Sequence, residues 1–177
     1  RVRHVHHRTR RRVEPDQRPE APRWPDGIAV RPLSPGKDDV PAVEAIRDVF
    51  RDHWGFAELT EEDYQRWLKE PMFMTQELWQ IAWDGDEIAG QVRNFINHRE
   101  NEEHGRLRGY TEFISVRRPW RRRGLARALI LRSLRLLKAR GMTEAALGVD
   151  TENLSGALHL YESCGFRPSK SGAMYRK

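Results

Sequence analysis

Hydrophobic and polar positions form a clear strand–helix–strand pattern between residues 108 and 149. Residues 108–116 predict a strand, with apolar or aromatic side chains at Tyr110, Phe113, Ile114 and Val116. Residues 125–140 predict a helix, with an apolar stripe at Ala126, Ile130, Leu134 and Leu137. Gly141 stands where a left-handed residue ends a helix, and residues 145–149 predict the next strand. This order is typical of a βαβ crossover, so we expect the two strands to be parallel.

The rest of the chain predicts further strands and helices around this unit. Strands are expected over residues 27–32, 78–83, 88–97 and 168–176, and Asp84-Gly85 marks a hairpin turn. Helices are expected after a cap at Asp38 or Asp39, after a capping-box-like start at Thr60, and over residues 154–163. Residues 97–105 predict a polar loop.

The join between the central strand and its helix is rich in arginine. Five arginines flank it, namely Arg117, Arg118, Arg121, Arg122 and Arg123, and Gly124 lets a ligand approach the backbone. The first turn of a helix has free N–H groups and a partial positive charge, so the join predicts a polyanion site, most simply for a pyrophosphate. Neither the P-loop spacing nor the dinucleotide fingerprint is present. A solvated or nucleic-acid-binding patch is the alternative for the arginines taken alone.

Two motifs resemble those of one enzyme superfamily. The pattern V-x-x-P-x-x-R-x-x-G-x-[GA], at Val116, Pro119, Arg121, Gly124 and Ala126, resembles the coenzyme A pyrophosphate loop of the GNAT N-acetyltransferases. Ala126 stands where many members have glycine. Residues 153–166 are similar to the family's second signature, N-x(3)-A-x-x-L-Y-x(3)-G-F. The motifs occur in the family's order and usual separation, and the resemblance covers roughly residues 27–177.

The resemblance implies a fold, a reaction and a cofactor site. The implied fold class is α/β (α+β), with a mixed, mostly antiparallel twisted sheet, one splayed parallel pair, and helices on both faces. The implied reaction moves the acetyl group of acetyl-CoA to a primary amine by direct attack in a ternary complex, and it needs no metal. Strand backbone would pair with the pantetheine amides, helix N–H groups and arginines would hold the pyrophosphate, and an asparagine would contact the pantetheine arm. The residues concerned are Ile114, Ser115, Val116, Arg121, Arg122, Arg123, Gly124, Leu125, Ala126, Arg127 and Asn153.

Two residues are the candidates for moving protons. Tyr161 falls on the tyrosine of the second motif, which in the family points at the thioester sulfur, so it is the expected acid or hydrogen-bond donor for the leaving thiolate. Some relatives carry a glutamate base just before the motif asparagine, but Gly148 occupies that position here. Glu112, on the strand that leads to the arginine-rich join, is the better candidate for the base, directly or through water.

The acceptor side has less pattern. In the family the first two helices form one wall of the acceptor pocket, which implies that Trp54, Phe56, Trp67 and Phe73 line it; ordinary core aromatics are the alternative. The acceptor could be a small amine, an antibiotic amine, an amino acid or a protein N-terminus. The Asp-rich clusters typical of a polycationic acceptor are not evident. An aminoglycoside-like or polyamine-like acceptor is kept as an alternative because six acidic residues lie close in sequence: Asp48, Asp52, Glu58, Glu61, Glu62 and Asp63.

Charge and composition narrow the possible partners. Residues 1–23 hold eight arginines against three carboxylates, which accounts for +5 of the net charge of +6, so the basic pI is weak support for nucleic-acid binding by the folded domain. No apolar run approaches the roughly 18 residues of a membrane span. The single cysteine, Cys164, fits a reducing compartment, and we expect a cytoplasmic protein.

The start of the chain predicts an arm separate from the main domain. Residues 1–25 combine a basic segment, with a short strand expected within residues 2–9, and a proline-rich linker; residues 26–177 would form the acetyltransferase-like domain. This arrangement resembles the C-terminal half of a tandem-GNAT protein. Residues 1–13 would then pair with a preceding GNAT domain or with a second copy of the chain.

Three other functions compete with acetyl transfer. The first is a catalytically silent GNAT-fold half with a structural or CoA-sensing role. The second is a nucleic-acid-binding basic module, which lacks the expected series of aromatics among its basic residues. The third keeps the chemistry and enlarges the acyl group.

Overall fold

The computed structural model describes residues 3–12, 19–34, 36–50, 60–69, 76–150 and 156–175, and within them one sheet organises the chain. The sheet has seven strands in the order β2-β3-β4-β5-β6-β1-β7. Their bounds are β1 Arg3–Arg12, β2 Ile28–Val30, β3 Gln80–Asp84, β4 Glu87–Ile96, β5 Arg108–Val116, β6 Glu144–Asp150 and β7 Arg167–Tyr175. Every pairing is antiparallel except that of β5 with β6, which is parallel. The mixed, mostly antiparallel sheet with one parallel pair is therefore confirmed.

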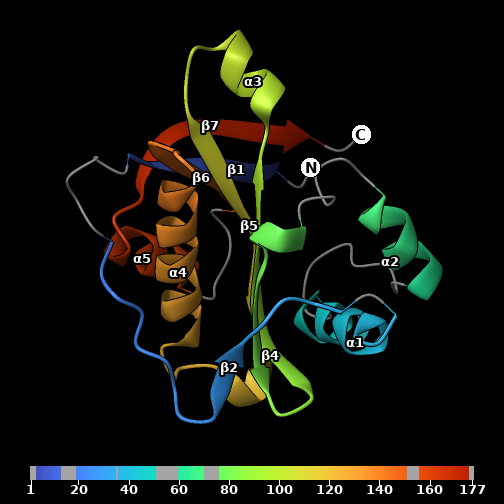
Figure 1. Ribbon diagram of the computed structural model, residues 1–177. Helices are drawn as coiled ribbons and strands as arrows, with labels where there is room; N and C mark the ends of the chain where they lie inside the picture. The colour runs from blue at the N-terminus through green and yellow to red at the C-terminus, as the bar shows by residue number, and fades with distance from the viewer. Residues whose placement is uncertain are drawn as a thin grey trace.

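Helices cover both faces of the sheet (Figure 1). They are α1 Asp39–Phe50, α2 Glu61–Leu68, α3 His98–Glu103, α4 Leu125–Ala139 and α5 Ala157–Ser163, with 3-10 turns η2 Gln76–Leu78 and η3 Arg118–Trp120. In Figure 1, α4 and α5 lie on one side of the sheet and α1 and α2 on the other. α3 projects from the far end of the β4–β5 arm.

The crossover helix α4 holds the core together. Ile130, Leu134 and Leu137 pack with β6 and α5 in one buried cluster, and Leu125 and Leu129 pack with β3 and β4 in another. A further buried cluster joins α1 to β3 on the opposite face. α4 therefore buries more of its surface than the predicted apolar stripe, because it spans four strands.

Local signals in the sequence correctly predicted several helix ends. Gly141 has φ +81 directly after the last turn of α4, as a left-handed helix stop requires. At the start of α2, Thr60 Oγ1 accepts a hydrogen bond from Asp63 N at 3.1 Å, and Thr60 N donates to Asp63 Oδ2 at 3.2 Å. This reciprocal pair is the capping box, with Asp63 in the role usually taken by glutamate.

The polar loop predicted over residues 97–105 is wrong, because α3 forms there. The Asn97 side chain caps α3 by accepting from Glu100 N at 3.0 Å, and Glu100 is then anchored by Tyr110 Oη, which donates to it at 2.8 Å. Asn101 is buried, with its amide bonded to the backbone of Arg108. A six-residue helix without an apolar stripe is stabilised by these tertiary contacts, which periodicity cannot reveal.

The N-terminal segment is an inner strand of the sheet. β1 lies between β6 and β7 of the same chain, with His7 in register with Val149 and His6 with Gly172 (Figure 1). The predicted strand is thus longer than expected and pairs on both sides within this chain. β1 pairs with β6 over residues 6–12 and with β7 over residues 3–10, so the predicted pairing of this segment with a preceding domain or a second copy finds no free strand edge over residues 6–10. The domain boundary at residue 25 stays a prediction.

Candidate functional site

The parallel pair β5–β6 opens into a gap. Only three residue pairs connect the strands, Arg108 with Glu144, Gly109 with Ala145, and Tyr110 with Ala146. Beyond these pairs β6 continues to Asp150 and stays paired with β1 on its other edge, but it no longer pairs with β5. The edge of β5 after Tyr110 therefore faces the gap. A splayed pair of this kind exposes backbone N–H and C=O groups that an extended ligand can use as an added strand would.

A bulge in β5 accompanies the gap. On β4, Arg93 pairs with Glu112 but Gln91 pairs with Ser115, so two residues of β5 oppose the single residue between them. Phe113 sits in the bulge with φ +50, a left-handed conformation that is strained for a bulky residue. Such strain is kept only where the surrounding structure enforces it, and it is typical of functional segments.

The loop after β5 presents backbone donors at the start of α4. The first helical hydrogen bond runs from Ala128 N to Gly124 O at 3.0 Å, so the N–H groups of Leu125, Ala126 and Arg127 have no acceptor within the helix. Gly124 has φ +80, and a Cβ built on it would meet no atom within 4 Å. Three free donors at a helix start, beside a glycine that leaves the approach open, fit a pyrophosphate.

The arginines of this loop have different surroundings. Arg122 and Arg123 are exposed, whereas Arg121 Nε donates to Val116 O at 2.9 Å, across the end of β5. Arg127 Nη2 lies 2.9 Å from Glu20 Oε2 of the linker. The side chain of Leu125 is 1% exposed and serves the core, so that residue can offer a ligand only its backbone.

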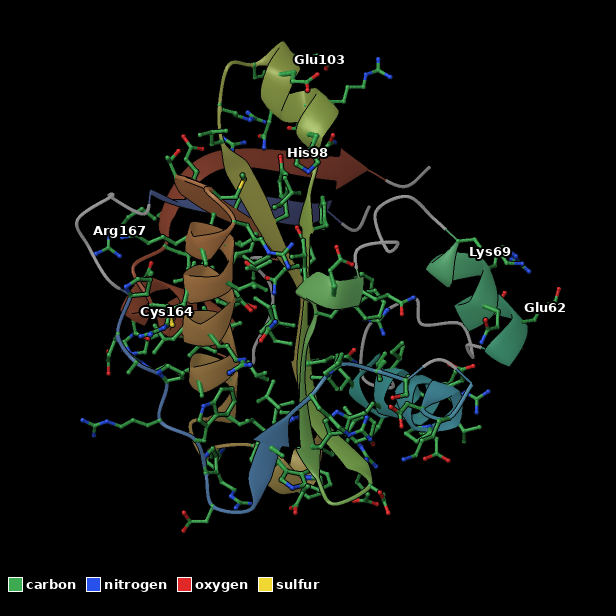
Figure 2. All side chains as sticks on the ribbon, in the orientation of Figure 1. Glu62, Lys69, His98, Glu103, Cys164 and Arg167 are labelled. Atoms are coloured by element: carbon green, nitrogen blue, oxygen red, sulfur yellow. The ribbon has the colours of Figure 1, made fainter. Side chains whose placement is uncertain are left out.

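Tyr161 and Glu112 come together at the gap. Tyr161 is 8% exposed within the cluster of α4, β6 and α5, and its ring packs edge-on against Phe166 at 6.3 Å. Burial raises the pKa of Tyr161 to about 12, and the negative charge of Glu112 and then that of Cys164 add to the rise. Cys164 follows the last turn of α5, beside α4 (Figure 2). The phenol therefore stays protonated throughout the physiological range.

Glu112 occupies space that Gly148 leaves open. A Cβ built on Gly148 would lie 3.7 and 3.8 Å from the two carboxylate oxygens of Glu112. The carboxylate thus reaches across the gap to β6, at the position where the resemblance led us to look for a glutamate. In this chain a glutamate at residue 148 would place a second negative charge beside that of Glu112, which is unfavourable.

The other predicted strand residues flank the gap. Ser115 is buried and in register with Gln91, and Val116 is in register with Gly90. Ile114 is half-buried and packs on both clusters that α4 forms. Ala126 is half-buried in the first turn of α4.

Several predicted site residues lie outside the described residues. These are Asn153, Trp54, Phe56 and Phe73. Trp67 belongs to α2, on the α1 side of the sheet. Their cofactor and acceptor roles stay predictions.

Two polar residues near the site have contacts that the sequence did not predict, although Asp48 was among the acidic residues considered for the acceptor. Arg93, on β4, is 1% exposed and in register with Glu112. Asp48, in the last turn of α1, accepts a hydrogen bond from Arg117 Nε at 3.2 Å and so ties the arginine-rich loop to α1. Neither residue belongs to a motif, and only the sheet register and the packing of α1 reveal them.

Comparison with known proteins agrees with this arrangement. The chain matches the acetyltransferase (GNAT) family over residues 43–166. With its splayed parallel strands and the unpaired N–H groups at the helix start that follows β5, this chain belongs to the acetyltransferase (GNAT) family.

Individual proteins are similar to this chain in sequence or in structure. It is 31% identical over 169 residues to the mycothiol acetyltransferase of Streptomyces scabiei, covering 96% of this chain and 52% of that relative. A GCN5-related N-acetyltransferase from Sphaerobacter thermophilus superposes with a TM-score of 0.78 at 28% identity, covering 98% of this chain and 51% of that one. A tandem GNAT protein from the clavulanic acid biosynthesis pathway shares the fold, with a TM-score of 0.67 at 15% identity over 96% of this chain and 52% of that one. The chain thus spans about half the length of the relatives it matches.

Two kinds of feature are absent from the described residues. In that part of the chain, no helix is long and apolar enough to cross a membrane. No group of three or more histidine, cysteine or acidic side chains there is arranged to hold a metal ion.

Proposed function

We propose that the chain transfers the acetyl group of acetyl-CoA to a primary amine by direct attack in a ternary complex. The observation that carries the proposal is the meeting of Glu112 and Tyr161 at the gap beside the free donors of α4. One group accepts protons, the other donates a hydrogen bond, and the anion site between the strands is suited to the pyrophosphate of coenzyme A.

The cofactor would be held by backbone and by charge. The free edge of β5 at Ile114 and Val116 supports pairing with the pantetheine amides. The N–H groups of Leu125, Ala126 and Arg127 would receive the pyrophosphate, with the side chains of Arg121 to Arg123 and Arg127 supplying positive charge. Asn153 is proposed to contact the pantetheine arm.

Glu112 would take the proton that the acceptor must lose. An ammonium group has no free electron pair, so it has to be deprotonated before the nitrogen attacks the thioester carbonyl. The carboxylate of Glu112 faces the gap at Gly148, where it can accept that proton directly or through one water molecule. The C–N bond then forms as the C–S bond breaks.

Tyr161 would stabilise the departing thiolate. Its pKa of about 12 lies well above the thiol value of about 8.5, so complete proton transfer from the phenol is uphill. The protonated phenol is therefore suited to donating a hydrogen bond to the sulfur as negative charge develops there. The thiolate acquires its proton afterwards, and Tyr161 keeps its own.

The acceptor class is proposed as a small-molecule or peptide amine. Relatives are named mycothiol acetyltransferases, which makes a mycothiol-related amine the first acceptor to test. A structural neighbour that shares the fold is a NatC complex bound to a peptide and CoA, which supports including peptide N-termini in the same screen.

The test is a thermal-shift titration with acetyl-CoA, CoA and ATP. Ligand at about 100 times its dissociation constant should stabilise the protein by ~2.7 kcal/mol. We expect both coenzyme A species to stabilise the wild type, ATP to do so weakly, and Gly124→Glu to abolish the shift through charge repulsion. Gly124→Ala is the matched control, because its Cβ meets nothing and only the left-handed backbone opposes it.

An acceptor screen follows a positive result. Release of CoA from acetyl-CoA is measured with a mycothiol-related amine, peptide N-termini and cationic amines. No thermal shift with either coenzyme A species would contradict the proposal and favour a catalytically silent half.

A further inference from the structure

A buried arginine lies opposite Glu112 on the neighbouring strand. Arg93 of β4 is the direct register partner of Glu112 and is 1% exposed. Directly opposed residues of antiparallel strands place their side chains on the same face, with Cβ atoms about 5 Å apart. A permanent positive charge is thus buried on the side chain that stands opposite Glu112 in the sheet. Burying a charge is expensive, so its position calls for an explanation.

Arg93 also contacts both ends of the bulge. Its Nε donates to Gln91 Oε1 at 3.0 Å, and Gln91 opposes Ser115 on the far side of the bulge. The guanidinium carbon lies 5.3 Å from the ring of Phe113, the residue with the left-handed backbone. On its other side it lies 4.3 Å from the ring of Trp79. The side chain therefore braces the bulge through a hydrogen bond and ring contacts.

The bulge begins directly after Glu112. Side chains alternate between the faces of a strand, so a change of one residue in register moves every following side chain to the other face. With the bulge in place, the oxygens of Glu112 lie against the bare backbone of Gly148. A residue that holds the bulge therefore also holds the end of the regular ladder at Glu112, from which the carboxylate extends.

We propose that Arg93 is a positioning residue for Glu112: its guanidinium fixes the bulge of β5 so that the carboxylate faces Gly148, and its charge keeps that carboxylate ionised. The inference rests on the proposed function for the role of Glu112 as base. The link between Arg93 and Glu112 is a property of the folded chain and can be measured without turnover.

Other groups lie near Glu112, and their effects on its titration have to be distinguished from the effect of Arg93. Tyr161 and Cys164 approach from α5, and both interact electrostatically in the same network. β6 contributes Gly148, which has no side chain. On β1, Arg8 is the register partner of Gly148. Variants of Arg93 and Arg8 must therefore be compared.

The experiment is a carbon-13 NMR titration of protein labelled at the glutamate side-chain carboxyl. The Glu112 signal is assigned by its loss in Glu112→Gln. In Arg93→Met, which removes the charge, we expect the titration midpoint of Glu112 to rise by about one pH unit. Arg93→Lys keeps the charge and should leave the midpoint close to that of the wild type. Arg108→Met is the matched control, because Arg108 is a buried arginine of β5 that pairs with Glu144 at the opposite end of the strand.

Turnover gives a second readout. The acidic limb of the pH profile of kcat/KM should move upward in Arg93→Met and stay in place in Arg93→Lys. Arg93→Lys should still lose about tenfold in kcat, because a lysine cannot reproduce the bond to Gln91 and the ring contacts that fix the bulge. A merely structural arginine would lower the amount of active protein and leave the limb in place.

Three outcomes would overturn the inference. They are an unchanged Glu112 midpoint in folded Arg93→Met, an equal rise in Arg108→Met, and a larger rise in Arg8→Met than in Arg93→Met. If Arg93→Met does not fold, Arg93→Gln gives the same readout, because it removes the charge and keeps a polar side chain. If Glu112→Gln leaves turnover unchanged, the base assigned in the proposed function is wrong, and the titration still decides whether Arg93 controls Glu112.

Discussion

Glu112 and Tyr161 lie close enough that the charge of one changes the protonation of the other. Burial is the largest cause of the raised pKa of Tyr161, about 12, and the carboxylate of Glu112 is the second. The two residues belong to different parts of the chain, β5 and α5. Burial and, after it, the negative charge of Glu112 thus keep the phenol of Tyr161 protonated, which is the protonation state that hydrogen-bond donation requires.

Replacing these two residues should have separable effects on turnover. We expect Tyr161→Phe to lower kcat about 100-fold with little change in the KM for acetyl-CoA, because the hydroxyl acts when the thiolate departs. Glu112→Gln should lower kcat/KM and remove the acidic limb of its pH profile. Steady-state kinetics with the acceptor found by the screen would measure both. Equal activity of Tyr161→Phe and wild type would contradict the assigned role.

The raised pKa of Tyr161 also predicts a pH dependence of stability. The folded pKa of about 12 exceeds the unfolded value of about 10, so the stabilisation is complete below pH 10 and is lost as the pH rises toward 12. Between pH 8 and pH 11 the wild type should lose about 1.4 kcal/mol more than Tyr161→Phe. Urea unfolding at the two pH values measures this difference, and the variant cancels the contributions of the other tyrosines. Equal losses in the two proteins would mean that Tyr161 titrates normally.

The ion pair between Glu20 and Arg127 should weaken cofactor binding slightly. Both side chains are substantially exposed, at 55% and 36%, so we expect Glu20→Gln to change the unfolding free energy by less than about 0.5 kcal/mol. Arg127 is then no longer shared with a carboxylate, and the affinity for CoA should rise roughly twofold, an effect that salt reduces. Isothermal titration calorimetry measures the affinity. Glu103→Gln is the control, since Glu103 pairs with Arg99 on the distant α3 (Figure 2).

The close contact between β5 and α4 predicts that substitution of Gly109 lowers the stability of the protein. A Cβ at Gly109 would lie 2.5 and 2.9 Å from the two methyl carbons of Leu137, which is fully packed in the core. Gly109→Ala should therefore destabilise the protein by about 1–3 kcal/mol through overpacking. Gly148→Ala on the adjacent strand is the control, because its Cβ would make only ordinary contacts. Chemical denaturation compares the two, and equal stability would show that α4 can move away from β5.

Short-range interactions account for what could be predicted from the sequence. The strand, crossover helix and strand of β5, α4 and β6 follow from hydrophobic periodicity, and the helix ends at Gly141 and Thr60 follow from hydrogen bonds within a few residues. Tyr161 became a candidate because of its position in the second motif. Glu112 became one because Gly148 occupies the position where some relatives carry a glutamate. The prediction of a loop over residues 97–105 was wrong because short-range patterns miss contacts made from outside a segment. Helix α3 is stabilised by Tyr110, which lies outside that helix.

By itself, the sequence determined the order of most elements and the free donors at the start of α4, since each depends on neighbours along the chain. It also named Tyr161 and Glu112 as candidates for moving protons, through the motifs that resemble the family's. Only the tertiary structure decided that β1 lies between β6 and β7, that Glu112 reaches Gly148, and that Arg93 is buried opposite Glu112. Those relationships depend on which strands pair, in which register, and where one strand bulges. A shift of a single residue in that register would reverse which face each side chain occupies, and no local pattern along the chain specifies it.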